Sequence, residues 1–190
     1  MIRIVAVGGT VNPGSGTERA LAVASDFARQ AGADVTLFDG AYLSALPYYG
    51  GPGHAPGTGS ELVDAVRHAD GLLIAAPGYH GTISGMVKNA LDFLEDLARD
   101  KRPYLDGRSV GLIATAYGDQ ATMSTLITMR GIVHALRGWP TPMGATVRTY
   151  RGLFTEDGRC TDPRVEQQLA LVGQQVVEGA LRSMRDPVDA

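Results

Sequence analysis

Residues 4–19, IVAVGGTVNPGSGTER, place an apolar run, a glycine-rich loop and the start of a charged helical pattern one after another. A continuous apolar run of this length is typical of a strand buried on both faces of a parallel sheet. The stretch therefore predicts a strand, a turn that exposes its backbone, and a helix, which is the repeating unit of an α/β domain.

The same alternation continues along the chain. Helical spacing of apolar residues covers residues 20–31, 62–66, 83–97 and 123–136, and the Asp162-Pro163 pair opens a last helix to about residue 184. Further apolar runs predict the remaining strands, which are Val35–Phe38, Leu72–Ala76, Val110–Ala114 and the weaker Ala145–Val147. We expect one domain over residues 1–190, with a five-stranded parallel sheet of order 2-1-3-4-5 and helices on both faces.

Composition narrows the function classes. The 190 residues carry a formal net charge of −3 and no block of Lys or Arg, so the electrostatic footprint of a nucleic-acid-binding protein is missing. One cysteine, Cys160, excludes an internal disulfide and a multi-cysteine metal site. No apolar run approaches the ~20 residues of a membrane span. We expect a cytoplasmic protein without membrane partners.

Ligands of an open parallel sheet bind beyond the carboxyl ends of its strands, where the strand order reverses. The loop after the first strand offers side-chain donors and the free N–H groups of a helix start, which favours a phosphate over a merely solvated turn. Its four donor side chains are Thr10, Asn12, Ser15 and Thr17.

Other phosphate motifs do not fit this loop. A Walker A loop needs Lys after its last glycine, but Gly14 is followed by Ser15. A dinucleotide fingerprint started at Gly14 has Arg19 where its third glycine belongs, and a low-molecular-weight phosphatase needs a cysteine here. A monophosphate ligand fits better. Asp39, after the second strand, is interpreted as a turn residue.

Two further loops expose backbone beside an aromatic side chain. The first is PGYHGTISG, residues 77–85, and the second is TAYGDQ, residues 115–120. Such loops suit the edge of a flat polar ring in a cofactor pocket.

At these residues the chain resembles the NAD(P)H-dependent FMN reductase family, which has a flavodoxin-like fold. The family's second signature looks like Pro-x-Tyr-x-x-x-x-Pro-Gly-x-Leu-Lys-Asn-Ala-Leu-Asp and aligns with residues 77–92. Its first loop, Gly-Ser-x-Arg-x-x-Ser, aligns with residues 9–15. Two family residues differ here: Asn12 stands at the common Arg and Ser84 at the common Pro. Asn12 removes a cation from the phosphate site.

The resemblance implies a set of cofactor contacts. Thr10, Asn12, Ser15 and Thr17 would hold the FMN phosphate. Lys88 and Asn89 would organise their helix and not touch flavin. The isoalloxazine ring would face Pro77, Gly78, Tyr79, His80, Gly81, Ala116, Tyr117 and Gly118.

By resemblance, the reaction passes hydride from NADPH or NADH to FMN, and reduced flavin serves a quinone-type acceptor, oxygen or a partner flavin-dependent monooxygenase. The cofactor carries this chemistry, so no catalytic side chain is expected. No metal site is expected either, since His54, His68 and His134 are scattered. Relatives imply a homodimer or homotetramer. Two alternatives stay open: a flavodoxin-like electron carrier and a non-redox nucleotide-binding module.

Overall fold

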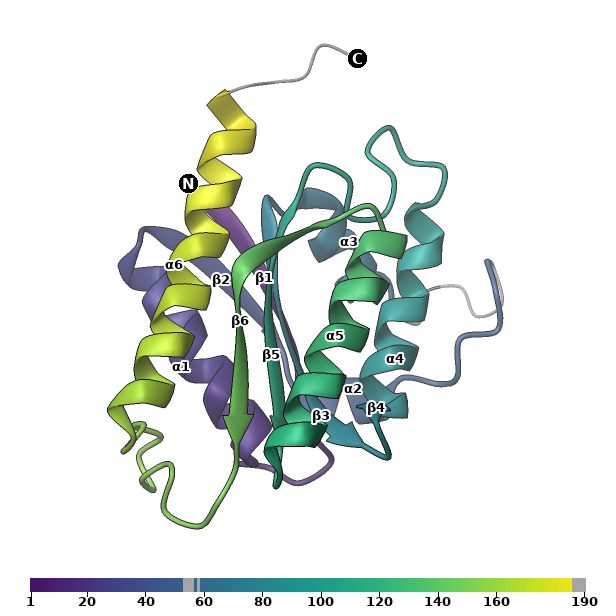
Figure 1. Ribbon diagram of the computed structural model, residues 1–190. Helices are drawn as coiled ribbons and strands as arrows, with labels where there is room; N and C mark the ends of the chain where they lie inside the picture. The colour runs from purple at the N-terminus through teal and green to yellow at the C-terminus, as the bar shows by residue number, and fades with distance from the viewer. Residues whose placement is uncertain (53–56, 58, 186–190) are drawn as a thin grey trace.

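A computed structural model describes residues 1–52, 57 and 59–185 of the chain. Its centre is a parallel sheet in the order β2-β1-β3-β5-β6, which confirms the predicted order of the five main strands (Figure 1). These strands are β1 (Ile2–Gly8), β2 (Ala33–Phe38), β3 (Gly71–Tyr79), β5 (Ser109–Ala116) and β6 (Trp139–Arg148). Strands β1, β3 and β5 are almost wholly buried, as their unbroken apolar runs require.

Helices cover both faces of the sheet and divide the core into two layers. On one face pack α1 (Gly16–Gln30) and α6 (Pro163–Arg185). The other face carries α2 (Gly40–Ala45), α3 (Ser60–His68), α4 (Gly85–Asp92), the 3-10 helix η1 (Phe93–Leu97) and α5 (Asp119–Ala135). No helix among the described residues is long and apolar enough to cross a bilayer.

Three boundaries differ from the sequence prediction. Ile83 does not begin the third helix but lies in a two-residue strand, β4 (Thr82–Ile83), that folds back on β3. Ser84 then caps α4, which passes into η1 at Phe93. The last strand starts at Trp139, well before the predicted Ala145, although Pro140 and Pro142 lie in it. An edge strand tolerates proline because one side of its backbone needs no partner.

The short helix α2 has no counterpart in the sequence prediction. Asp39 begins it, since its carboxylate accepts the Tyr42 amide at 2.9 Å. Part of the predicted long loop at residues 46–59, including His54, lies outside the described residues.

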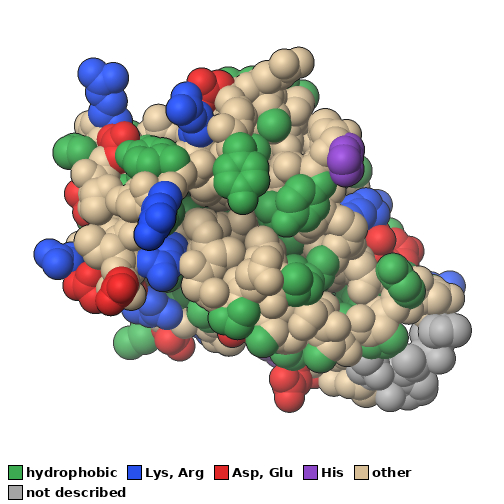
Figure 2. Space-filling model, turned by 90° about the horizontal axis from the view of Figure 1, so that it is seen from below, with side chains coloured by type: hydrophobic (Ala, Val, Ile, Leu, Met, Phe, Trp, Pro, Cys, Tyr) green, Lys and Arg blue, Asp and Glu red, His purple; other side chains and the backbone are tan. Residues whose placement is uncertain are grey.

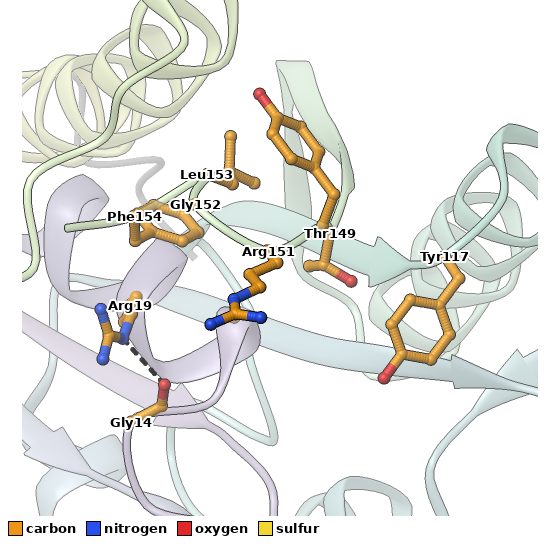
Figure 3. Close-up of a pocket in the computed structure, with 10 residues that line it drawn as sticks. Gly14, Arg19, Tyr117, Thr149, Arg151, Gly152, Leu153 and Phe154 are labelled. Atoms are coloured by element: carbon orange, nitrogen blue, oxygen red, sulfur yellow. Dashed lines mark hydrogen bonds between the residues drawn. The ribbon is translucent and has the colours of Figure 1, made fainter. Parts of the chain in front are cut away.

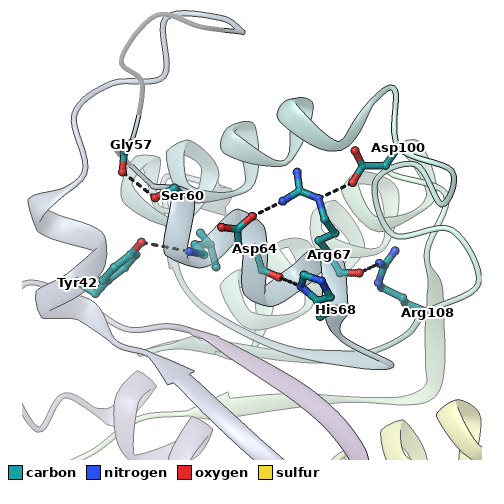
Figure 4. Close-up of polar contacts among 9 residues, drawn as sticks. Tyr42, Gly57, Ser60, Asp64, Arg67, His68, Asp100 and Arg108 are labelled. Carbon is teal, nitrogen blue, oxygen red and sulfur yellow. Dashed lines mark hydrogen bonds and ion pairs between the residues drawn. The ribbon is translucent and has the colours of Figure 1, made fainter.

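The amino end of the sheet is closed by a polar network (Figure 4). Arg108 is fully buried at the start of β5 and donates to the carbonyls of Ala69, Tyr104 and Arg67 at 2.8–3.1 Å. Arg67 in turn pairs with Asp100 at 2.8 Å. These contacts tie α3 to β5 at the amino end of the sheet. The loops at the opposite, carboxyl end are not covered by this network.

Candidate functional site

The loops that follow β1, β3, β5 and β6 all lie at the carboxyl end of the parallel sheet. Figure 2 looks onto this end and shows exposed apolar side chains around its centre, with Lys and Arg side chains gathered on the side beneath α1 and α6. Tyr79 and Tyr117 are among the exposed apolar residues. The two termini of the described chain are at or near the other end (Figure 1).

The first loop is fixed by its own polar groups. Ser15 is the N-cap of α1 and its hydroxyl accepts the Glu18 amide at 3.3 Å. The Glu18 carboxylate reaches back to the Gly14 amide at 2.7 Å, a variant of the capping box. The Thr10 hydroxyl receives the Asn12 amide at 3.1 Å, and the Asn12 side chain is exposed. The loop is therefore preformed, and it ends at the first-turn amides of α1, of which the Glu18 amide is bound by Ser15.

Thr17 is placed differently from its neighbours in this loop. Its side chain is buried and its hydroxyl lies 2.7 Å from the Thr115 hydroxyl on β5. Beside this pair, the Thr149 amide donates to the Ala116 carbonyl at 2.8 Å. These contacts clamp the start of α1 to the ends of β5 and β6, so Thr17 holds the loop in position from beneath.

The loop after β3 is a tight hairpin. Tyr79 pairs with Thr82, and the two residues between them, His80 and Gly81, both have positive φ, 51° and 89°. A two-residue turn of type I′ requires this conformation, which glycine adopts freely and histidine only occasionally. The side chains of Tyr79 and His80 are exposed at the hairpin tip, while Pro77 is buried at its base.

The third loop consists of Tyr117 and Gly118, which join Ala116 at the end of β5 to α5. Tyr117 is 89% exposed. Gly118 precedes α5 and supplies no side-chain cap, so the first amides of that helix remain open. A Cβ at Gly118 would meet no atom within 4 Å, which leaves space beside this backbone.

Pockets among the described residues open at this end of the sheet, and two of them are lined partly by residues not expected from the sequence. The first, of about 370 Å³, lies between the first loop and the segment after β6 (Figure 3). The second, of about 440 Å³, is mainly apolar and lies between the first loop, α2 and α4. Lining residues absent from the sequence prediction include Thr149, Arg151 and Phe154 in the first pocket, and Val11, Leu43 and Met86 in the second.

Asn89 ties α4 to the segment that follows α2. Its side-chain oxygen accepts the Tyr49 amide at 2.9 Å and its side-chain nitrogen donates to the Pro47 carbonyl at 2.9 Å. Lys88 pairs with Asp92 on the same helix. Tyr48, next to the anchored residues, lines the apolar pocket, so Asn89 shapes that pocket through the loop it holds.

Histidine, cysteine and carboxylate side chains elsewhere in the described structure do not gather into a metal site, and its cysteine is not activated. Among the described residues, no group of three His, Cys, Asp or Glu is placed to hold a metal ion. Cys160 is partly buried, and burial raises the pKa of its thiol, which disfavours the thiolate that a nucleophile needs.

The donor set suits FMN. Hydroxyl and amide donors at the start of α1 match a phosphate. The open backbone at Gly118 and the hairpin of β3 leave edges for a flat ring with polar atoms. The apolar pocket beside Val11 and Met86 adds a surface of the kind that aromatic ligands prefer.

Comparisons with known proteins agree with this geometry. FMN-dependent NADPH-azoreductase of Staphylococcus aureus is 33% identical over 98 residues, which are 52% of this chain and 48% of the relative, so the match spans about half of each protein. The fold resembles FerB of Paracoccus denitrificans, a flavoenzyme NAD(P)H:(acceptor) oxidoreductase, with a TM-score of 0.80 at 19% identity over 96% of this chain and 99% of that one. It also resembles the NADH:FMN oxidoreductase EMOB in its apo form, with a TM-score of 0.71 at 21% identity over both full chains.

The model of one family, described as NADPH-dependent FMN reductase, matches residues 2–150. That range contains β1 through β6 and the loops after β1, β3 and β5. The chain belongs to the NADPH-dependent FMN reductase family.

Proposed function

We propose that this protein is an NAD(P)H-dependent FMN reductase that binds FMN across the carboxyl end of its sheet. One observation carries the proposal: a preformed, donor-rich loop at the start of α1 shares this end with two loops that expose backbone and aromatic side chains. Membership of the FMN reductase family supports it.

The residues divide between the two ends of the cofactor. The side chains of Thr10, Asn12 and Ser15, with the first amides of α1, bind the phosphate. Thr17 supports them through Thr115 and is a positioning residue. The backbone of residues 77–81 and 116–118 would hold the ring.

When bound, FMN supplies a ring that accepts hydride, and the nicotinamide of NADPH or NADH supplies the hydride. The chain orients the two and holds no proton for the transfer. Tyr79 is 53% exposed and Tyr117 89% exposed, so both aromatic side chains are available to pack against a second flat molecule. The acceptor is a quinone-type small molecule, oxygen or a flavin-dependent monooxygenase.

The first experiment is a visible spectrum of the purified protein with and without FMN, followed by anaerobic addition of NADPH or NADH. We expect a bound flavin spectrum that bleaches with at least one nicotinamide. Flavin that binds and stays oxidised would support the electron-carrier alternative, and an absence of flavin binding would contradict the proposal.

A second experiment locates the phosphate. Ser15→Ala removes a phosphate donor and also a helix cap, which costs about 0.5–2 kcal/mol of stability. We expect FMN affinity to fall and riboflavin affinity to stay, because only FMN carries the phosphate. Ser84→Ala is the matched control, since Ser84 caps α4 and its hydroxyl also accepts an amide at 3.3 Å. Equal losses for both flavins in Ser15→Ala would place the phosphate elsewhere.

A further inference from the structure

The 370 Å³ pocket beside the first loop is rich in positive charge (Figure 3). Its wall joins Gly14 and Gly16 of that loop to Tyr117 and to the segment after β6. The described residues that line it include two arginines, Arg19 and Arg151, and no carboxylate. A pocket of this composition next to a helix N-terminus suits an anion.

The first loop itself contains no cation. Residues 8–17 include no Lys, Arg or His, and the nearest charged side chain along the chain is Glu18. Its carboxylate accepts the Gly14 amide and brings a negative charge to the loop. A dianionic phosphate bound here therefore needs a cation from another element.

Arg19 is already engaged in holding the structure. Its Nε donates to the Gly14 carbonyl at 2.8 Å, and one terminal nitrogen donates to the Thr155 carbonyl. The side chain thus ties the first loop to the segment after β6 and sets the width of the pocket.

Arg151 is held differently. The Leu153 amide donates to the Tyr150 carbonyl at 3.2 Å, and Gly152 has φ +91°, so Arg151 occupies the second position of a type II turn. Leu153 is buried and anchors the turn, while the Arg151 side chain is exposed. Among the described residues no carboxylate lies within ion-pair distance of it, since the ion pairs of this region join Arg148 to Asp119 and Arg159 to Asp157.

We propose that Arg151 supplies the cation for the FMN phosphate, across the pocket from the first loop. The inference rests on the proposed function, since it assigns a further residue to the same cofactor. Gly152 and Leu153 fix the turn that carries Arg151 before any ligand binds. Binding therefore does not have to order a loop, which lowers its entropic cost. The residue binds and positions the cofactor and takes no part in hydride transfer.

The test measures the dissociation constants of FMN and riboflavin, by quenching of flavin fluorescence, for the wild type and for Arg151→Gln. Without the charge-assisted hydrogen bond to the phosphate, FMN binding should weaken by roughly 10- to 100-fold, while riboflavin binding stays unchanged. Arg99→Gln is the control, because Arg99 is also exposed but follows η1, away from the pocket. It should change neither affinity.

A second variant tests the location of the charge. Asn12→Arg places a cation within the first loop, so the double variant Asn12→Arg with Arg151→Gln should regain FMN affinity without gaining riboflavin affinity. Unchanged FMN affinity in Arg151→Gln, or equal losses of affinity for the two flavins, would overturn the inference about Arg151. The proposed function would still stand in that case, provided that the wild type binds flavin. A wild type that binds neither flavin would overturn both.

Discussion

At the scale of single residues, the position of the β3 hairpin depends on the missing side chain of Gly78. A Cβ there would lie 2.4 Å from the Thr125 hydroxyl and 3.2 Å from the Ala121 carbonyl, both on α5. Thr125 is buried, and its hydroxyl has no hydrogen-bond partner among the described residues. This close approach brings the base of the hairpin against α5.

We expect Gly78→Ala to destabilise the protein by about 1–3 kcal/mol, because overpacking forces the strand or the helix to move. Thr125→Ala removes the hydroxyl that the new methyl group would meet and leaves its Cβ at an ordinary 3.5 Å. The double variant should therefore lose less unfolding free energy than the two single variants lose together. Urea unfolding of all four proteins measures this coupling. Additive costs would show that this contact does not set the position of the strand.

Residue-level expectations succeed where the relevant partner is close in sequence. The cap at Asp162 follows from local pattern, and the structure contains it, with the Asp162 carboxylate accepting the Arg164 amide at 2.9 Å. Local pattern groups Thr17 with the donors of its loop, but its nearest polar partner, Thr115, lies 98 residues away. A partner at that distance is brought close only by the sheet topology, and spacing alone does not show it.

At the scale of elements, the segment after α2 is attached to the α4–η1 unit through Asn89 and through Tyr49. The Tyr49 hydroxyl donates to Asp96 at 3.0 Å, and its ring packs edge-on to Phe93 at 5.1 Å between centroids. Burial, the bond to Asp96 and nearby carboxylates together raise the pKa of Tyr49 to about 12.

This raised pKa predicts a pH dependence of stability. The unfolded tyrosine ionises near pH 10, so the contribution of Tyr49 is complete below that pH and is lost as the pH rises toward 12. Tyr49→Phe lacks the ionising group. The stability difference between wild type and variant should be constant from pH 7 to 9 and should change in favour of the variant between pH 10 and 12. Denaturant unfolding of both proteins across this pH range measures the difference in unfolding free energy. A difference that does not change with pH would contradict the raised pKa of Tyr49.

The junction of α3 and β5 depends on Arg108. Burial lowers the pKa of its guanidinium to about 10, which still leaves it charged at neutral pH. Arg108→Ala would leave three carbonyl groups without their hydrogen-bond donor and would create a cavity. We therefore expect a loss of about 3–5 kcal/mol in the free energy of unfolding.

Arg108 lies at the amino end of the sheet, and the proposed FMN site lies at the carboxyl end. We therefore expect the folded fraction of Arg108→Ala to bind FMN with wild-type affinity. Calorimetric or fluorescence titration at a temperature where it is folded provides this check. A large loss of affinity in the folded variant would mean that the two ends of the sheet are coupled.

Element types are predictable where the apolar pattern is strong. Strands β1, β3 and β5 are buried on both faces and carry unbroken apolar runs. Strand β6 at the sheet edge alternates and contains two prolines, so the sequence indicates only its last residues. The hairpin at His80 and Gly81 is absent from the sequence prediction because β4 has two residues, which is too short to produce a pattern.

At the scale of the whole molecule, the two ends of the sheet are built for different tasks. The amino end is closed by the Arg108 network, and the carboxyl end carries the pockets beside the first loop. The sequence points to three of the loops there, because a topological switch point can be deduced from strand order. The turn that carries Arg151 follows the last, weakly patterned strand, so its place beside the first loop emerges only from the assembled sheet.

The exposed surface of α5 predicts self-association. Met123 and Ile127 are 51% and 63% exposed and lie four residues apart, so they share one face of the helix next to the Tyr117 loop. Met129, in contrast, is buried in the core. Exposed apolar groups gathered beside a candidate cofactor site are typical of an interface. The family resemblance implies a homodimer or homotetramer, and we place its interface on this face.

Ile127→Glu should therefore shift the protein toward monomers, because a carboxylate buried at an interface is costly to desolvate. Size-exclusion chromatography with light scattering, over a range of protein concentrations, measures the mass directly. Leu181→Glu is the matched control, since Leu181 is 39% exposed on α6, on the other face of the sheet. A monomeric wild type at every concentration, or equal dissociation in both variants, would remove α5 as the interface. Dissociation by Ile127→Glu alone would place the second copy beside the Tyr117 loop, at the carboxyl end of the sheet.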